Sequence, residues 1–259
     1  ALARSDARAL RDRRPDLTGL MVDVAFTAAE ARRSDVTIVI DVLRATSTIV
    51  QALQAGYRRV LCADGLDRAR GLVAPGRVLA GERHCVRPSG FDLGNSPAET
   101  IPPRGEELVL ATTNGAPAIL RAAELSSVVL IACLLNLDAV VEAAAGDEVQ
   151  LLCSGTDGRP ALEDVYVAGR IAARLGGRHS DSALVARAVA GAYSRGRDAL
   201  AMSADARVLA AAGLQADIDW CAQESVVSFV PRLCDLTAGV ATVGAGTSIE
   251  LKQSVLTDI

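Results

Sequence analysis

The sequence predicts an α/β fold in which helices cover a mainly parallel β-sheet. Half of its 259 residues are hydrophobic but only 3% are aromatic, a composition more typical of helices on a parallel sheet than of an aromatic-rich β-sandwich. Short runs rich in β-branched residues alternate with segments of helical periodicity, which is the order of βαβ units. The length is sufficient for one large α/β domain or two small ones.

Strands and helices are predicted in alternation from about Leu20 to Cys153. The runs expected to be strands lie at residues 20–26, 36–41, 57–62, 77–80, 107–112, 127–132 and 148–153. The helical patterns between them lie at about 46–55, after Gly65, at 114–123 and at 137–145. Because βαβ connections make successive strands parallel, their carboxyl ends are expected to share one edge of the sheet.

The two ends of the chain differ from this alternating region. Residues 1–18 are polar and rich in arginine, so we expect a leader outside the core. Residues 19–236 are predicted to form a single domain, with a helix-rich cap segment at about 160–233 whose last helical pattern is at 217–233. Residues 237–259 are predicted to be a C-terminal tail.

Composition limits the class of partner. The net charge of -4, a pI near 5.3 and the few aromatic residues argue against a nucleic-acid surface, so a small-molecule partner is expected. Six cysteines without a CxxC pair indicate free thiols in a reducing compartment, and hence a cytoplasmic protein. No apolar run is long enough to predict a membrane span. A homo-oligomer is compatible with the sequence.

The stretch DVLRATST at 41–48 has the strongest chemical signal. Asp41 ends an apolar run, so its carboxylate should stand at the sheet edge where ligands bind in open α/β folds. Thr46 or Ser47 is expected to cap the next helix, and Thr46 is also a candidate phosphate contact. A cation is disfavoured at a helix N-terminus, so Arg44 indicates a bound anion or an acidic neighbour. The alternative is a surface pair between Asp41 and Arg44.

A second loop, TTNG, also follows a predicted strand. Its residues Thr112, Thr113 and Asn114 can cap a helix or bind an anion, and Gly115 can let the backbone approach a ligand closely. An ordinary strand-to-helix turn uses the same residues, so this loop alone does not distinguish a phosphate site from a structural turn.

The loop GFDLGNSP at 90–97 is the third candidate. Ser96, Pro97 and Glu99 match a capping box with proline at the first helical position, which gives Ser96 a structural explanation. We therefore rank Asn95 and the loop amides above Ser96 as substrate contacts.

Acidic residues supply candidate metal ligands. Glu82 follows a predicted strand, and Arg83 beside it could bind the substrate. Asp164 falls on the apolar face of a predicted helix, whereas Glu163 falls on a more exposed face. A buried acid needs a partner or a metal, so Asp164 joins Asp41 as a candidate for catalysis and metal binding.

The expected metal is a hard cation. Carboxylates without clustered His or Cys favour Mg²⁺, which is usually bound through one or two carboxylates together with phosphate oxygens. Asp41, Glu82 and Asp164 are the predicted ligands. Arg44 is predicted to stabilise the charge of the substrate.

These motifs together resemble one family. The ordered segments VIDVLRATSTIVQAL, LAGER, GFDLGNSP, TTNGAPAI and ALEDVYVAG are similar to those of the 2-phosphosulfolactate phosphatases, over about residues 22–231. The resemblance implies a three-layer α/β/α fold. It also implies a Mg²⁺-dependent hydrolase that converts 2-phosphosulfolactate to sulfolactate and phosphate in coenzyme M biosynthesis. Other phosphorylated 2-hydroxy acids stay open as substrates.

Two other functions were weighed against this one. The chain could be a non-catalytic phosphometabolite-binding protein, although it lacks both the GxGxxG and P-loop patterns. It could also be a cysteine-dependent phosphatase, because Cys62 and Cys153 each precede an arginine by six positions. Acidic neighbours of Cys62 would disfavour its thiolate.

The residue two positions after Asp41 bears on the mechanism. In the haloacid-dehalogenase pattern this position holds a second acid, and here it is Leu43. We therefore expect direct attack by water rather than a phosphoaspartate.

Overall fold

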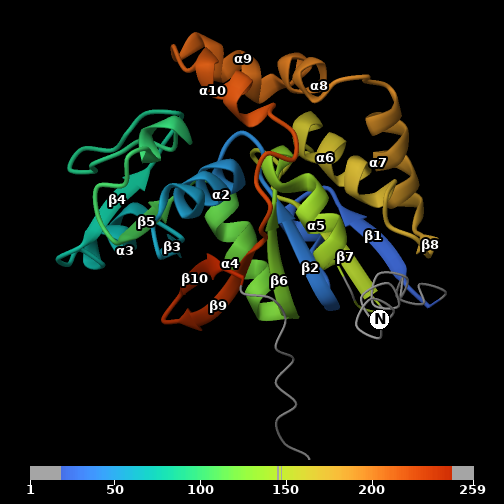
Figure 1. Cartoon of the computed structure of the whole chain (residues 1–259), viewed down its shortest axis with the longest axis horizontal. Helices are drawn as coiled ribbons and strands as arrows, with labels where there is room; N and C mark the ends of the chain where they lie inside the picture. The colour runs from blue at the N-terminus through green and yellow to red at the C-terminus, as the bar shows by residue number, and fades with distance from the viewer. Residues whose placement is uncertain (1–18, 145, 147, 247–259) are drawn as a thin grey trace, which may run out of the picture.

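The computed structural model describes residues 19–144, 146 and 148–246. The predicted leader, residues 1–18, and residues 247–259 of the predicted tail lie outside the described residues. Within the described part, ten strands form one mixed sheet in the order β4-β5-β3-β10-β9-β6-β2-β7-β1-β8 (Figure 1). The strands are β1 (Met21–Ala25), β2 (Ser34–Ile40), β3 (Arg59–Ala63), β4 (Arg77–Gly81), β5 (Glu107–Ala111), β6 (Ser126–Ala132), β7 (Glu148–Cys153), β8 (Arg178–His179), β9 (Pro231–Thr237) and β10 (Val240–Ala245).

Two parallel blocks make up most of the sheet. Strands β6, β2, β7, β1 and β8 pair in parallel, as do β3, β5 and β4. The antiparallel hairpin β9–β10 lies between the blocks, with β10 paired to β3 and β9 joined to β6 at Leu130 and Arg232. The helices are α2 (Ala45–Ala55), α3 (Leu66–Gly71), α4 (Gly115–Leu125), α5 (Leu137–Ala143), α6 (Leu162–Ala172), α7 (Asp181–Gly191), α8 (Gly196–Met202), α9 (Ala204–Ala211) and α10 (Gln215–Cys221).

Side chains on both faces of the sheet are buried between helices. In β2, Ile38 and Ile40 pack with Tyr166 of α6 in one apolar cluster, whereas Val39 packs with Ile49 of α2 in another. Because successive side chains of a strand point to opposite faces, one continuous apolar run supplies both cores. The predicted three-layer α/β/α fold with a mixed sheet is therefore confirmed.

The end of the domain differs from the prediction. The helical pattern predicted at 217–233 ends early, since α10 stops at Cys221 and β9 begins at Pro231. The predicted tail is also wrong in part, because β10 lies between β3 and β9 with Ala241 and Val243 fully buried. The sequence of β10 is short and made mostly of small residues, so it has no distinctive strand pattern. The strand is buried because it pairs with β3, which is distant in the chain, and with β9, to which a tight turn joins it.

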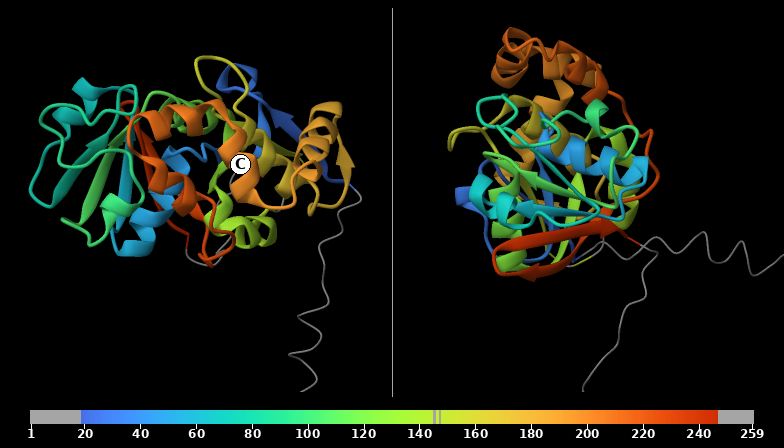
Figure 2. Two further views of the ribbon diagram at one scale, coloured as in Figure 1. Left: turned by 90° about the horizontal axis from the view of Figure 1, so that it is seen from above. Right: turned by 90° about the vertical axis from the view of Figure 1, so that its left-hand side faces the viewer.

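Helices α8, α9 and α10 form a cap on the side of the molecule opposite the β9–β10 hairpin (Figures 1 and 2). Helix α9 begins at a standard cap, in which the hydroxyl of Ser203 accepts a hydrogen bond from the N–H of Ala206 at 3.0 Å. Ser180 serves α7 in the same way. The cap leaves a cavity between itself and the strand ends.

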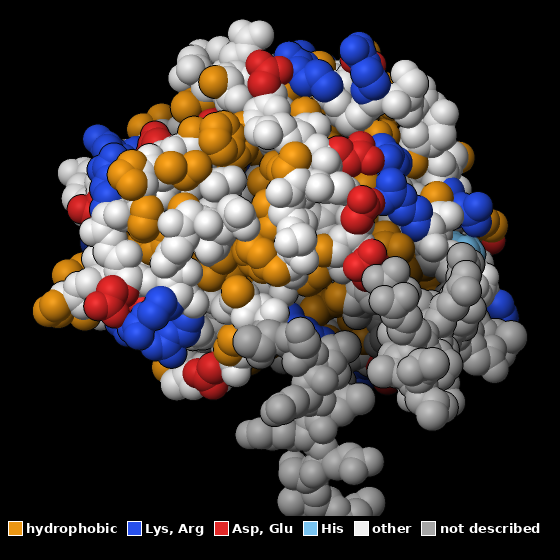
Figure 3. All heavy atoms as spheres, in the orientation of Figure 1, with side chains coloured by type: hydrophobic (Ala, Val, Ile, Leu, Met, Phe, Trp, Pro, Cys, Tyr) orange, Lys and Arg blue, Asp and Glu red, His pale blue; other side chains and the backbone are white. Residues whose placement is uncertain are grey.

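Figure 3 shows one face of the molecular surface. Charged side chains of both signs are scattered over the face seen in Figure 3, and the basic ones do not gather into one patch there. In the part of the chain that the structure describes, no helix is both long and apolar enough to cross a bilayer.

Candidate active site

The carboxyl ends of four strands meet around one cavity beneath the cap. The loops after β2, β4, β5 and β7 line it, together with Asn95 and one side of α9. The cavity has a volume of about 250 Å³, and its lining residues are Asp41, Leu43, Arg44, Glu82, His84, Cys85, Asn95, Thr112, Thr113, Asn114, Thr156, Asp157, Asp205, Val208 and Leu209.

This lining divides the predicted site residues into two groups. The structure brings together Asp41, Arg44, Glu82, Asn95, Thr112, Thr113 and Asn114 at the cavity. It places the others outside the lining, namely Thr46, Arg83, Ser96, Gly115 and Asp164.

Asp41 stands at the end of β2 and holds the start of α2. Its Oδ1 accepts a hydrogen bond from the N–H of Ala45 at 2.9 Å. Gly115 is required here, since a Cβ at this position would lie 2.6 Å from Asp41 Oδ2 and would collide with Ala45. Gly115 therefore lets α4 approach Asp41 and not a ligand. Burial raises the pKa of Asp41 to about 6, and the nearby charges of Asp205 and Glu82 add to the effect.

The start of α2 differs from the predicted cap. The hydroxyl of Thr46 donates to the carbonyl of Asp41 at 2.7 Å, and that of Ser47 donates to the carbonyl of Val42 at 2.8 Å. Both side chains are buried and point back toward the strand end. The predicted caps are therefore wrong, because the carboxylate of Asp41 takes the first helical N–H instead.

Arg44 lines the cavity although only 3% of the residue is exposed. Its Nη1 lies 2.6 Å from Oδ2 of Asp217 on α10, in a buried ion pair. The acidic neighbour that the sequence predicted for Arg44 is thus Asp217, and the alternative of a surface pair with Asp41 is wrong.

Ser96 is part of the same contact. Its hydroxyl donates to Oδ1 of Asp217 at 2.7 Å. The predicted capping box is wrong, because only a short 3₁₀ turn, Ala98–Thr100, forms there, and Glu99 accepts from the N–H of Gly94 at 2.6 Å. A Ser-x-x-Glu pattern satisfies the local rule for a cap, but here the serine hydroxyl binds a carboxylate that is distant in sequence and the glutamate binds an amide of its own loop.

Glu82 joins the ends of β4 and β5. Its Oε1 accepts hydrogen bonds from the N–H and the hydroxyl of Thr113, both at 2.8 Å, and its Oε2 accepts from the N–H of Cys85 at 3.2 Å. Arg83 instead donates to the carbonyl of Glu82 at 3.0 Å. The carboxylate of Glu82 is therefore held at the cavity wall, and Arg83 is not part of that wall.

Of two polar side chains at the cavity, Thr112 has a hydrogen-bond partner for its hydroxyl, whereas Asn95 lacks one for its amide oxygen among the described residues. The hydroxyl of Thr112 accepts from the N–H of Ala116 at 2.9 Å, so Thr112 binds the first turn of α4. The amide oxygen of Asn95 is buried at the cavity and has no hydrogen-bond partner among the residues that the structure describes. An unpartnered buried acceptor is costly, so this oxygen indicates a missing ligand contact.

Asp164 is buried behind the cavity wall and connects the loops after β2 and β7. Its oxygens accept from the N–H of Val42 at 2.9 Å and from the hydroxyl of Ser154 and the N–H of Gly155, both at 3.2 Å. Burial and the charge of Asp41 raise its pKa well above the usual range. Its contacts are those of a residue that shapes the loops.

The predicted metal trio is not assembled. Within the described residues, no three His, Cys, Asp or Glu side chains form a group that could hold a metal ion. The expected exposure of Glu163 is also wrong, because it is 1% exposed and its Oε2 has no hydrogen-bond partner. Burial, followed by the charges of Asp164 and Asp205, raises the pKa of Glu163 well above the usual range.

Asp205 and Thr156 are cavity residues that sequence reasoning missed. Oδ2 of Asp205 on α9 accepts from the hydroxyl of Thr156 at 2.5 Å. Asp205 lies in the first turn of a helix, where an acid is unremarkable, and Thr156 is 49 residues away. The sequence did predict a helix-rich cap segment that includes Asp205, but it did not show which part of the sheet that segment covers.

The cysteines of the alternative mechanism lie elsewhere. Cys62 and Cys153 are buried in the apolar clusters and do not line the cavity. Burial raises the pKa of Cys62 to about 12 and that of Cys153 well above its usual value. Such thiols are poor nucleophiles at neutral pH.

Comparison with known proteins shows which family the chain is similar to. A profile of the 2-phosphosulpholactate phosphatase family matches residues 24–235. A probable 2-phosphosulfolactate phosphatase of Pseudothermotoga lettingae is 40% identical over 215 residues, covering 82% of this chain and 95% of the relative. One of Thermus thermophilus is 40% identical over 208 residues, covering 77% and 88%.

An archaeal relative gives the same result. The 2-phosphosulfolactate phosphatase of Methanothermobacter thermautotrophicus is 35% identical over 200 residues, covering 76% of this chain and 86% of the relative. The family match includes the strand ends that form the cavity and the cap helices above them. The chain therefore belongs to the 2-phosphosulfolactate phosphatase family and is a hydrolase of phosphoric monoesters.

Proposed function

We propose that this protein is a Mg²⁺-dependent phosphatase that hydrolyses 2-phosphosulfolactate, or a closely related phosphorylated 2-hydroxy acid, to the free hydroxy acid and phosphate. Three relatives that cover most of the chain are named for this reaction or as probable catalysts of it. The proposal also depends on the charges of the residues that line the cavity.

An excess of carboxylates in the cavity is the observation that supports the proposal most strongly. Asp41, Glu82, Asp157 and Asp205 line it, whereas the one arginine in the lining, Arg44, is already paired with a carboxylate outside it. The proposed substrate has a phosphate, a sulfonate and a carboxylate. Such an anion can enter an acidic cavity only if cations neutralise the charge between them.

The cavity residues fit Mg²⁺ as that cation. Burial raises the pKa of Asp41 to about 6, and the charges of Asp205 and Glu82 add smaller contributions. Side chains with oxygen donors line the same space, and Mg²⁺ typically takes one or two carboxylates and completes its shell with water and phosphate oxygens. Asp41, with Asp205 or Glu82, would hold the ion. When bound, it would supply positive charge to the phosphoryl oxygens.

The protein's own residues would hold the substrate around this centre. Arg44 can bind one end of the anion, and Thr113 and Asn114 lie just before the N-terminus of α4, where amides and the helix dipole favour a phosphate. The unpartnered amide oxygen of Asn95 can accept a hydrogen bond from water bound beside the substrate. Water is proposed to attack directly, because Leu43 stands where a phosphoaspartate mechanism would place its second acid.

The test is phosphate release from a panel of substrates, measured with Mg²⁺ and with EDTA. The panel is 2-phosphosulfolactate, 2-phospholactate and an aryl phosphate. We expect release that requires Mg²⁺ and is fastest with 2-phosphosulfolactate. Absence of release from all three, together with tight binding of one of them, would favour the non-catalytic binding protein. Activity that survives EDTA but is lost with iodoacetamide would favour a cysteine mechanism.

A further inference from the structure

Helix α10 of the cap contributes one buried carboxylate to the site, Asp217. It is 4% exposed and does not line the cavity. Its Oδ2 lies 2.6 Å from Nη1 of Arg44, and its Oδ1 accepts from the hydroxyl of Ser96 at 2.7 Å. Its two hydrogen-bonded partners are the direct contacts through which it can affect a substrate.

The two partners lie in different segments of the chain. Arg44 lines the cavity, immediately precedes α2 and is 173 residues from Asp217. Ser96 lies outside the lining, in the loop at 90–97, and is 121 residues from Asp217. It is adjacent to Asn95, which lines the cavity and whose buried amide oxygen has no hydrogen-bond partner among the described residues. One carboxylate on the cap thus holds Arg44 directly and the Asn95 loop through Ser96.

This arrangement determines the orientation of Arg44. A guanidinium is planar with five N–H donors in a fixed fork, so holding Nη1 limits the directions of the others. Among the described residues, none accepts a hydrogen bond from the remaining side-chain nitrogens of Arg44. A buried ion pair adds little net stability compared with apolar residues of similar size, so the value of this pair lies in its geometry.

We infer that Asp217 is a positioning residue of the phosphatase site, which fixes the guanidinium of Arg44 and the Asn95–Ser96 segment against the phosphate-binding side of the cavity. The inference rests on the proposed function, because it assigns Asp217 a role in the turnover of the same substrate. Helix α10 would then have a role in substrate turnover as well as in forming the cap.

The test compares Asp217→Asn with Asp219→Asn, a matched change two residues along the same helix. Asp219 forms an exposed ion pair with Arg197 and does not line the cavity. With 2-phosphosulfolactate and Mg²⁺, we expect Asp217→Asn to lower kcat/KM by about 10- to 100-fold, through both a lower kcat and a higher KM. Asp219→Asn should stay within about twofold of the wild type.

A double-mutant cycle separates positioning from general stability. In the Arg44→Lys background, Asp217→Asn should lower kcat/KM by less than about threefold, since the group that it orients has already been changed. Equal effects of Asp217→Asn in both backgrounds would overturn the inference. So would a kcat/KM for Asp217→Asn within about twofold of that of Asp219→Asn.

A milder variant keeps the test valid if Asp217→Asn does not fold. Ser96→Ala removes one of the two contacts of Asp217 and should lower kcat/KM by about 3- to 10-fold, with the melting curve recorded alongside. Unchanged kinetics in Ser96→Ala would count against the inference. Inactivity of the wild type would refute the proposed function instead, so the two failures are distinguishable.

Discussion

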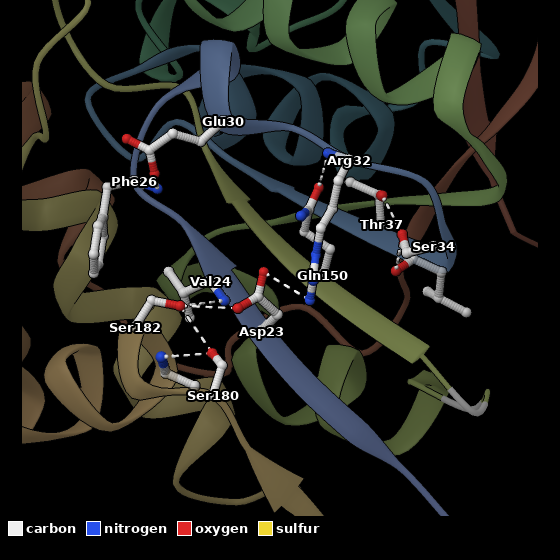
Figure 4. Close-up of polar contacts among 12 residues, drawn as sticks. Asp23, Val24, Phe26, Glu30, Arg32, Ser34, Thr37, Gln150, Ser180 and Ser182 are labelled. Carbon is white, nitrogen blue, oxygen red and sulfur yellow. Dashed lines mark hydrogen bonds and ion pairs between the residues drawn. The ribbon is translucent and has the colours of Figure 1, made fainter.

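Two polar clusters of this protein, both built on strands of the same sheet, differ in how their carboxylates are satisfied. Around Asp23 on β1, Ser182 donates to Oδ1 at 2.9 Å and Arg32 lies 3.0 Å from Oδ2 (Figure 4). Nearby Ser180 and Ser182 are in contact at 2.8 Å, and Gln150 accepts from the N–H of Arg32 at 3.0 Å.

The cluster at the cavity has the opposite character. Asp41 faces other acids, Asn95 has an amide oxygen without a partner, and the carboxylates outnumber the cations. None of the residues around Asp23 lines that cavity. An unpartnered amide atom does not separate the two clusters, because Gln150 Nε2 beside Asp23 is also buried and has no hydrogen-bond partner among the described residues. The clusters differ in charge balance and in position, since only the candidate site combines an excess of carboxylates with a cavity.

The largest expected effect is a loss of kcat on substitution in the cavity cluster but not in the cluster around Asp23. Asp41→Asn should lower kcat for 2-phosphosulfolactate by about 1,000-fold, because it removes a charge proposed to hold Mg²⁺ while keeping the size of the side chain. Steady-state phosphate release measures this effect. The matched change, Asp23→Asn, should leave kcat per folded molecule unchanged. A similar loss in both variants would show that the comparison is wrong.

The second effect concerns stability and pH. Because burial raises the pKa of Asp41 from 3.8 to about 6, the folded state binds more protons than the unfolded state in this interval, and stability falls as pH rises through it. In EDTA at pH 8, Asp41→Asn should therefore be more stable than the wild type by roughly 2–3 kcal/mol. At pH 3 the difference should nearly vanish. Denaturant unfolding at both pH values tests this, and a less stable variant at pH 8 would contradict it.

Arg44→Lys tests the cationic side of the cavity. A lysine retains the charge but loses the planar fork that can hold Asp217 and a phosphate together, so kcat/KM should fall by about tenfold. The matched control is Arg32→Lys in the other cluster, whose kinetics should equal those of the wild type. Wild-type kinetics in Arg44→Lys would place Arg44 outside substrate binding.

The smallest expected effect is on stability at Asp23, where the pKa shift and the pH dependence have the opposite sign to those of Asp41. Burial alone would raise the pKa of Asp23, but the hydrogen bonds of Ser180 and Ser182 and the charge of Arg32 outweigh it and lower that pKa. Asp23 thus contributes stability above its unfolded pKa and loses it as pH falls through the folded value. Asp23→Asn should lose about 1 kcal/mol at pH 7 and less at pH 3, measured by unfolding. A gain at pH 7 would contradict this.

Local sequence was sufficient for most of the fold. The run predicted as a strand at 36–41 is β2 (Ser34–Ile40), and the run at 107–112 is β5 (Glu107–Ala111), because these runs are apolar on both faces. Strand β10 was missed because a short segment of Ala, Gly and Val has no distinctive pattern until its neighbours are known.

The site was predictable where it follows the strands. Asp41, Glu82 and Thr112 come directly after or close to strand ends, and parallel strands bring such ends together. Asp205 and Asp217 were not predictable, because each reaches the site from the helical cap across 49 or more residues of sequence. Local patterns cannot specify contacts at that separation.

The central claim is that the cavity around Asp41 hydrolyses a phosphorylated 2-hydroxy acid with the help of Mg²⁺. The most direct measurement is phosphate release from 2-phosphosulfolactate by the wild type, Asp41→Asn and Asp23→Asn, each with Mg²⁺ and with EDTA. We expect release by the wild type and Asp23→Asn with Mg²⁺, and almost none in EDTA or from Asp41→Asn. Full activity of Asp41→Asn, or of the wild type in EDTA, would contradict it.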